Sequence, residues 1–238
     1  REVANALDLV PLLKKSASKL TADQKQLISL GRGLVRDNVS AILMDEPLTV
    51  IDPDLKFRLR RQLKEINQKY QSTLIYVTHD QNEAMTFAEN IIVMDEGNIV
   101  QVGTPAELFE RPQTTFVGYF IGAPAMNFFE CECVDAQTIA FGSAKIATQT
   151  NLEKVKIKNL KLGIRSEYIT LTNSVGENTL RASVHNVEDM GNNKLLTAIF
   201  EGNSIKIKVK REVEVPEDIV FLKFPAEHCC VYQNEKLL

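Results

Sequence analysis

Ala41-Ile42-Leu43-Met44-Asp45-Glu46-Pro47 is the stretch that decides the fold expected for this 238-residue chain. Its apolar run is too short for a helix and predicts a strand that is buried on both faces of a parallel sheet. The run ends in two adjacent carboxylates, Asp45 and Glu46. Because open α/β sheets bind ligands at the carboxyl ends of their strands, the pair indicates a Mg²⁺ and nucleotide site. Taken alone, however, an Asp-Glu-Pro sequence more often only begins a loop.

A second apolar run, residues 73–78, supports the functional interpretation. It ends in His79 and Asp80, and Asp52 lies between the two runs, ahead of a helix. Two strands that end at one sheet edge present their last side chains to the same ligand. We therefore expect Glu46 and His79 to converge.

These segments resemble three motifs of the ABC-transporter ATPases, in the same order and with the same spacing. Residues 42–47 are similar to the Walker B motif, residues 48–52 to the D-loop, and residues 76–81 to the switch-histidine loop. The resemblance implies that the chain binds ATP and Mg²⁺ and that it catalyses phosphoryl transfer by positioning and charge.

The same resemblance implies a role for each residue. Asp45 would hold Mg²⁺ through water, and Glu46 would orient or deprotonate the attacking water. His79 would contact the γ-phosphate, and Asp52 would report across a dimer interface. Glu46 and His79 are thus the candidate catalytic residues.

Residues 20–24, Leu-Thr-Ala-Asp-Gln, align with the family signature leucine-serine-glycine-glycine-glutamine and depart from it at three positions. Thr21 keeps a hydroxyl and is a candidate N-cap, with Gln24 placed as in a capping box. In the family this segment closes on the γ-phosphate held by a second subunit, so the resemblance assigns Thr21, Asp23 and Gln24 to nucleotide binding. Asp23 replaces a glycine and opposes phosphate, because two unit charges at about 4 Å repel by roughly 1 kcal/mol in water. Alternatively, Asp23 turns away to solvent.

After residue 52 the sequence predicts a helix over residues 54–70, and beyond His79 it predicts a helix over residues 82–88 and a hairpin over residues 91–102. A capping box at Thr104 and Glu107 predicts a further helix that ends before Pro112. Residues 103–127 resemble the bridge by which the ATPase subunits of carbohydrate and glycerol-phosphate importers lead into an extra domain.

From about residue 127 the pattern changes to short alternating strands, for example residues 154–158 and 205–210. This pattern favours a small β-barrel or sandwich. Residues 162–167, Leu-Gly-Ile-Arg-Ser-Glu, resemble a motif of the importers' regulatory domain, with Ser166 in place of proline. The expected fold class is α/β. An incomplete P-loop NTPase (ABC ATPase) domain with a mainly parallel sheet, residues 1–122, precedes an all-β domain of the OB or TOBE type, residues 123–238.

Composition narrows the possible partners. The chain has 28 basic and 31 acidic residues, a formal charge of −3 and no polybasic run, so neither nucleic acid nor anionic lipid is indicated. No apolar run approaches the roughly 18 residues of a membrane span, and no signal peptide is visible. The cysteines form a C-x-C and a C-C pair rather than C-x-x-C pairs, which favours core packing over zinc. His185 and His228 are interpreted as structural.

No Gly-x-x-x-x-Gly-Lys-Ser/Thr phosphate loop occurs in these 238 residues. The resemblance places that loop upstream of the signature, so we expect the chain to be the C-terminal part of a longer protein and to be inactive alone. The whole protein is expected to energise import of a sugar, polyol or glycerol-phosphate from the cytoplasmic face of the inner membrane. Its expected partners are transmembrane permease subunits and a second, preferably different, ATPase subunit. Two alternatives are an inactive regulatory or dimerisation module and a non-transport ABC ATPase.

Overall fold

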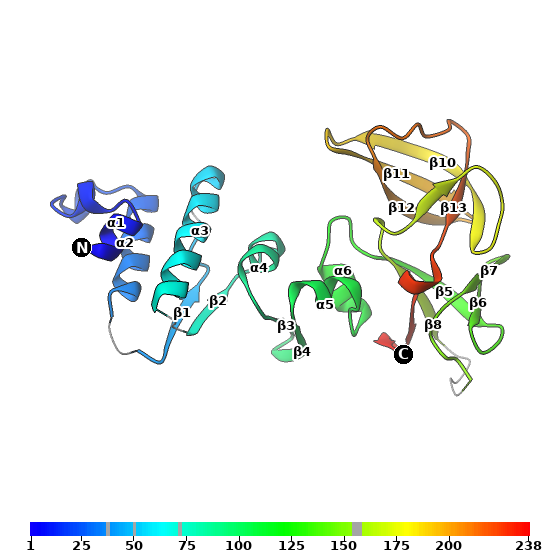
Figure 1. Ribbon diagram of the computed structural model, residues 1–238, viewed down its shortest axis with the longest axis horizontal. Helices are drawn as coiled ribbons and strands as arrows, with labels where there is room; N and C mark the ends of the chain where they lie inside the picture. Colours follow the sequence, from blue (N-terminus) through cyan, green and yellow to red (C-terminus); the bar gives the residue numbers. More distant parts are fainter. Residues whose placement is uncertain (37–38, 50, 71–72, 154–158) are drawn as a thin grey trace. The chain divides into compact units, whose positions relative to one another are not determined.

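The computed structural model describes residues 1–36, 39–49, 51–70, 73–153 and 159–238. The chain forms two compact units, Arg1–Ala88 and Glu89–Leu238, which Figure 1 shows in blue to cyan and in green to red. The domain boundary expected between residues 122 and 123 stays a prediction. The predicted strand at residues 154–158 and Val50 of the predicted D-loop lie outside the described residues.

Unit 1, Arg1–Ala88, packs helices against a small parallel sheet. Its elements are α1 (Glu2–Ala6), η1 (Val10–Leu12), η2 (Ala17–Lys19), α2 (Ala22–Leu34), β1 (Ala41–Asp45), α3 (Pro53–Tyr70), β2 (Thr73–Val77) and α4 (Gln81–Phe87). β1 and β2 run parallel, with Asp45 opposite Val77, so both strands end at one edge. This arrangement confirms the predicted parallel pair.

The helices of unit 1 form where the sequence predicts them. Thr21 and Gln24 form the expected capping box at the start of α2. α3 buries Leu59, Leu63 and Ile66, which lie on one face of the helix and contribute to the core of the unit. Met44 of β1 joins the same core, so the sheet is anchored through one face.

The prediction that the first strand is buried on both faces is wrong for the described residues. Leu43 is 74% exposed, and Ile75 and Val77 are 46% and 53% exposed. Successive side chains of a strand point to opposite faces, so these three lie opposite Met44. The described helices of the unit pack on the Met44 face only, which leaves the other apolar face to solvent.

Unit 2, Glu89–Leu238, begins with a hairpin and two short helices. These elements are β3 (Ile91–Asp95), β4 (Asn98–Gly103), α5 (Pro105–Glu110) and α6 (Thr115–Phe120). The hairpin turns through Glu96 and Gly97, both at positive φ (45° and 78°), as a tight two-residue turn requires. The capping box of Thr104 and Glu107 also forms as predicted.

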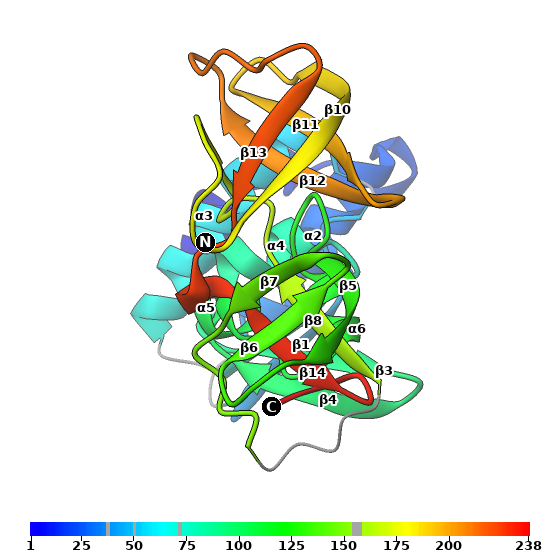
Figure 2. The ribbon, with the colours of Figure 1, turned by 90° about the vertical axis from the view of Figure 1, so that its right-hand side faces the viewer.

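Two antiparallel sheets make up the rest of unit 2 (Figure 2). Their strands are β5 (Asn127–Cys133), β6 (Thr138–Phe141), β7 (Ala144–Ala147), β8 (Leu160–Ile164), β9 (Thr170–Thr172), β10 (Thr179–Asp189), β11 (Asn193–Phe200), β12 (Asn203–Lys210), β13 (Ile219–Lys223), β14 (Cys230–Gln233) and β15 (Lys236–Leu237), with the 3-10 turn η3 (Ala226–His228) before β14. One sheet has the order β12-β11-β10-β13-β9 and the other β15-β14-β8-β5-β6-β7. The all-β character predicted for this part of the chain is therefore confirmed.

The two sheets of unit 2 share one hydrophobic core. Leu162 of β8, Leu196 of β11 and Ile207 of β12 are all fully buried in it, and Cys131, Cys133 and Cys229 contribute to the same cluster. The amide of Asn127 joins the sheets, because it donates to the carbonyl oxygen of Lys206 at 2.9 Å and accepts from the same residue's backbone N–H at 2.9 Å. The cysteines thus pack as apolar side chains.

Arg165, which directly follows β8, ties the two short helices of unit 2 to this core. Its Nε donates to the carbonyl oxygen of Phe109 at 2.8 Å, and its Nη1 donates to those of Gly118 at 3.1 Å and Ile121. These carbonyls lie near the C-terminal ends of α5 and α6, where helix carbonyls lack intrahelical partners and a cation is favoured.

Among the described helices of the chain, none is long and apolar enough to cross a bilayer.

Candidate functional site

The candidate site lies at the shared edge of β1 and β2. The backbone N–H of Glu46 donates to the carbonyl oxygen of Val77 at 2.9 Å, which carries the parallel ladder one residue past β1. Glu46 then turns with φ of 43°, a left-handed conformation that costs a non-glycine residue about 1–2 kcal/mol. Such a cost is typical of functional sites, and here the turn presents the carboxylate at the end of the strand.

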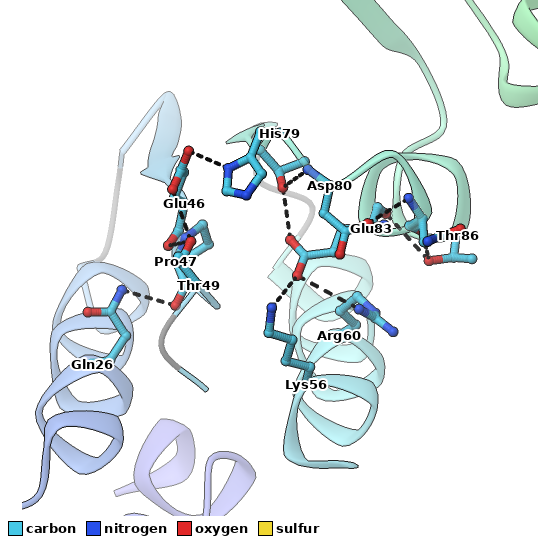
Figure 3. A network of polar contacts seen from close by, with 12 residues as sticks. Gln26, Glu46, Pro47, Thr49, Lys56, Arg60, His79, Asp80, Glu83 and Thr86 are labelled. Atoms are coloured by element: carbon cyan, nitrogen blue, oxygen red, sulfur yellow. Dashed lines mark hydrogen bonds and ion pairs between the residues drawn. The ribbon is translucent and has the colours of Figure 1, made fainter. Parts of the chain in front are cut away.

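Glu46 and His79 face each other at this edge (Figure 3). The Nδ1 atom of His79 lies 2.7 Å from Oε1 of Glu46, and the side chains are 71% and 42% exposed. An ionised carboxylate only accepts hydrogen bonds, so Nδ1 carries the proton of this pair. The other ring nitrogen, Nε2, is left to face a ligand.

Each partner changes the pKa of the other. The hydrogen bond to Glu46, followed by its charge, raises the pKa of His79. The hydrogen bonds from His79 and then from Thr49 lower the pKa of Glu46. Both shifts favour the charged pair. At neutral pH, Glu46 is therefore ionised, as a residue that orients or activates water must be.

Two neighbours hold the turn after Glu46. The hydroxyl of Thr49 lies 3.1 Å from Oε2 of Glu46 and 3.2 Å from its carbonyl oxygen. From α2, the side-chain amide of Gln26 donates to the carbonyl oxygen of Pro47 at 3.0 Å. Sequence reasoning identified neither residue as part of the site.

A buried carboxylate, Glu83, lies behind His79 and was also missed. It is 3% exposed in the first turn of α4 and accepts from the hydroxyls of Tyr76 and Thr78 at 2.8 and 3.0 Å. Lys56 and Arg60 of α3 lie 3.3 and 3.9 Å from its other oxygen. The available signal was an acidic residue three positions after Asp80, the residue that caps α4.

The candidate signature residues form a separate cluster at the start of α2. The hydroxyl of Thr21 donates to the carboxylate of Asp23, and this contact lowers the pKa of Asp23. Asp23 therefore stays ionised, and it engages the hydroxyl of Thr21, which aligns with the serine of the signature. Gln24 accepts from the backbone N–H of Thr21 at 3.4 Å. The alternative, in which Asp23 turns to solvent and away from a bound phosphate, stays a prediction.

The remaining predicted residues, Asp45 and Asp52, are both exposed. Asp45 is the last residue of β1, next to Glu46. The carbonyl oxygen of Asp52 accepts a hydrogen bond from the backbone N–H of Lys56 in the first turn of α3. No group of three or more potential metal ligands occurs among the described residues. Mg²⁺ bound with a nucleotide usually takes one or two carboxylates, with waters and phosphates completing its shell. One exposed Asp45 at a strand end fits that mode and no closed protein site.

Curated proteins similar to this chain are import ATP-binding proteins. The sn-glycerol-3-phosphate import protein UgpC of Paracoccus denitrificans is 36% identical over 209 residues, 88% of this chain and 58% of that protein. The trehalose import protein SugC of Mycobacterium tuberculosis is 35% identical over 95% of this chain and 62% of its own length. The trehalose/maltose import protein MalK of Thermococcus litoralis is 36% identical over 93% and 63%, respectively.

The chain spans only about six tenths of the length of these relatives, from 58% to 63%. It matches no protein-family model. Among solved structures, an ATP-binding cassette of an ABC transporter in its ADP conformation overlaps 47% of this chain and 44% of its own, with 24% identity and a TM-score of 0.41. That overlap is too limited to indicate function.

Proposed function

Because this chain belongs to the family of ABC-importer ATP-binding subunits, we propose that the whole protein hydrolyses ATP to energise solute import. The observation that carries the proposal is the 2.7 Å contact between Glu46 Oε1 and His79 Nδ1 at the carboxyl ends of two parallel strands. A carboxylate and an imidazole at one sheet edge suit a reaction that depends on positioning and charge.

Each candidate residue has a part in this reaction. Glu46, kept ionised by His79 and Thr49, orients or accepts a proton from the attacking water. His79 uses the ring nitrogen that Glu46 leaves open to contact the terminal phosphate. Asp45 would hold Mg²⁺ through water, and the ion would supply charge neutralisation of the phosphate oxygens. Asp52 reports the state of this site to the second subunit across a dimer interface.

The cargo proposed for this importer follows from the relatives. Their names state import of sn-glycerol-3-phosphate, trehalose, maltose and oligosaccharides. A sugar, polyol or glycerol-phosphate is therefore the proposed solute class. We propose that transmembrane permease subunits bind the protein and place it at the cytoplasmic face of the inner membrane.

ATP hydrolysis by the product of the complete coding region tests this function. Glu46→Gln is expected to lower kcat by at least about 100-fold, because it removes the group that orients and deprotonates water, and to leave ATP binding intact. Glu89→Gln serves as the matched control, since Glu89 is exposed in the sequence after α4. Equal activity in the wild type and Glu46→Gln would exclude the proposed role.

Asp23 leads us to propose a second, different ATPase subunit as the partner. The signature hydroxyl of Thr21 is bonded to the Asp23 carboxylate, which also brings a negative charge to the segment that meets phosphate. In a homodimer, Asp23 would weaken phosphate binding at both nucleotide sites, whereas in a heterodimer it would do so at only one. Turnover by the purified product alone is expected to rise about tenfold in Asp23→Gly, with Asp8→Gly as a control outside the segment. Robust, cooperative turnover by the unaltered protein would contradict the heterodimer.

One observation favours an alternative, a regulatory or dimerisation module without catalysis. These 238 residues contain no Gly-x-x-x-x-Gly-Lys-Ser/Thr loop to cradle phosphates. Calorimetric titration of the chain with Mg-ATP separates the two functions. Binding in the micromolar range favours the ATPase, whereas no binding up to millimolar ATP favours the regulatory or dimerisation module for this chain.

A further inference from the structure

The Glu83 network links β2, α3 and α4 around a buried carboxylate (Figure 3). A buried charge is stable only when hydrogen bonds and opposite charges satisfy it. Glu83 has two hydroxyl donors on one oxygen, and Lys56 and Arg60 beside the other. Burial, followed by the hydrogen bond to Glu83 and its charge, raises the pKa of Tyr76, so this hydroxyl remains a donor. The carboxylate therefore has the partners that keep it in place.

This network reaches the backbone on both sides of His79. On one side, the hydroxyl of Thr78 donates to Glu83 at 3.0 Å and accepts from the backbone N–H of Asp80 at 3.0 Å. On the other, the Asp80 carboxylate accepts from the backbone N–H groups of Asn82 at 2.8 Å and Glu83 at 3.4 Å. The turn that carries His79 is thus closed by side-chain bonds before and after it.

His79 itself depends on this turn because its own side chain is 71% exposed. No core packing fixes an imidazole in that position, so its placement opposite Glu46 comes from the backbone that carries it. Glu46, Asp80 and Glu83 are the charges that raise the pKa of His79, and Glu83 contributes least among them. Lys56 and Arg60 lie against the Glu83 carboxylate. The effect of Glu83 on His79 is therefore mainly geometric.

We propose that Glu83 is a positioning residue, which acts through the hydroxyl of Thr78 to hold His79 opposite Glu46. Its relevance to turnover rests on the proposed ATPase function, but the positioning itself does not. Glu83 touches neither the phosphate nor the attacking water in this scheme. It fixes the conformation of the backbone turn that carries the His79 imidazole.

Thr78→Val tests the proposal without changing any charge. Proton–nitrogen NMR correlations of the His79 ring, recorded above its titration midpoint, report which nitrogen carries the proton. In the wild type we expect the proton mostly on Nδ1, opposite Glu46. In Thr78→Val and Glu83→Gln the spectrum is expected to move toward the mixture of tautomers found for a free imidazole. Thr78→Ser, which restores the hydroxyl, is expected to return the wild-type spectrum.

Tyr76→Phe is the matched control, because it removes the other hydroxyl bonded to the same oxygen of Glu83. It is expected to lower stability and to leave the His79 ring spectrum unchanged. His185, exposed on β10, is an internal reference in each spectrum. If Thr78→Val unfolds at a lower temperature but keeps the wild-type His79 spectrum, Glu83 is only structural and the proposal is wrong. If the His79 ring spectrum of Tyr76→Phe changed as much as that of Thr78→Val, the proposed route through the Thr78 hydroxyl would be excluded.

Turnover separates this proposal from the proposed function. In the complete product, Thr78→Val is expected to lower kcat about tenfold with an unchanged KM for ATP, and Thr78→Ser is expected to restore it. An unchanged kcat beside a normal wild-type rate would contradict the positioning role. If the wild type hydrolyses no ATP while the His79 spectrum responds as expected, the ATPase function fails and the positioning role is supported.

Discussion

Glu83 in unit 1 and Arg165 in unit 2 are both buried charged side chains, but their partners differ in kind. Glu83 binds side chains: two hydroxyls, with a lysine and an arginine close by. Arg165 binds three backbone carbonyls, and the ring of Phe109 lies 4.4 Å from its guanidinium carbon. A backbone carbonyl neither titrates nor changes rotamer, so the contacts of Arg165 are with the fold itself. Glu83 instead joins groups that lead to an exposed functional side chain.

The distances along the chain differ in the same way. Arg165 reaches carbonyls 44 to 56 positions earlier in the sequence, whereas Tyr76 and Thr78 lie seven and five positions from Glu83. Losing Arg165 therefore removes one of the links between the C-terminal ends of two helices and the sheet that contains β8. Losing Glu83 loosens one turn and its contact with α3. The comparison predicts a large effect on stability at Arg165 and a smaller, local effect at Glu83.

The largest effect is expected for Arg165→Met. This change removes the Arg165 donor from the carbonyl oxygens of Phe109 and Ile121, whereas that of Gly118 keeps the backbone N–H of Met126 at 3.1 Å. We expect unit 2 to lose about 3 kcal/mol of unfolding free energy. Hydrogen exchange of amides in α5 and α6 measures the loss. Arg181→Met, on the exposed face of β10, is expected to change it little. Equal exchange in the two variants would show that Arg165 does not hold α5 and α6 in place.

A smaller loss is expected for Glu83→Gln. Gln keeps an acceptor for one hydroxyl but loses the charge beside Lys56 and Arg60, which are partly exposed. We expect unit 1 to lose about 1–2 kcal/mol, measured by hydrogen exchange in β2 and α4. Exchange in α5 and α6 provides the internal control, because the Glu83 contacts lie within unit 1. If Glu83→Gln lost as much unfolding free energy as Arg165→Met, the effect of Glu83 would not be local and the predicted difference between the two residues would be wrong.

Phe109→Leu tests the aromatic contact of Arg165 alone. The carbonyl oxygen of Phe109 remains, while the ring beneath the guanidinium is removed, and a cation–π contact at a partly buried ring is worth about 1–2 kcal/mol. We expect unit 2 to lose roughly that amount on thermal unfolding. A loss equal to that of Arg165→Met would mean that the ring, and not the carbonyls, anchors the arginine.

The smallest effect is a pH dependence at the Glu46–His79 pair, whose members are both exposed. The raised pKa of His79 contributes stability that is complete below about pH 6.5 and is lost as pH rises through the raised value. The lowered pKa of Glu46 contributes stability that is present above about pH 4.3 and is lost as pH falls through the lowered value. The Tm difference between wild type and Glu46→Gln is therefore expected to peak between these values. A difference that does not vary with pH would exclude the charged pair.

Local patterns allowed most elements to be predicted from the sequence. The capping boxes at Thr21 and Thr104, the hairpin turn at Gly97 and the apolar stripe of α3 all depend on residues close together in the chain. The convergence of Glu46 and His79 was also predictable, because parallel strands bring their ends to one edge. Their catalytic roles stay predictions.

Long-range burial was harder to predict. Charged residues are usually exposed, so nothing in the sequence around Glu83 or Arg165 indicates that each is almost fully buried. Their partners are set by tertiary packing, which brings α3 to Glu83 and the ends of α5 and α6 to Arg165. The same dependence made the prediction for the first strand wrong, because an apolar run does not tell how many faces its neighbours cover.

The uncovered face of β1 and β2 has a practical consequence for handling the purified chain. Leu43, Ile75 and Val77 form an aliphatic strip beside strand edges that pair with no further strand among the described residues, a combination that promotes reversible clustering between molecules. Raising the ammonium sulfate concentration strengthens such contacts. Sedimentation profiles are therefore expected to shift with protein concentration, and Leu43→Lys is the simplest change to restore a single sharp boundary.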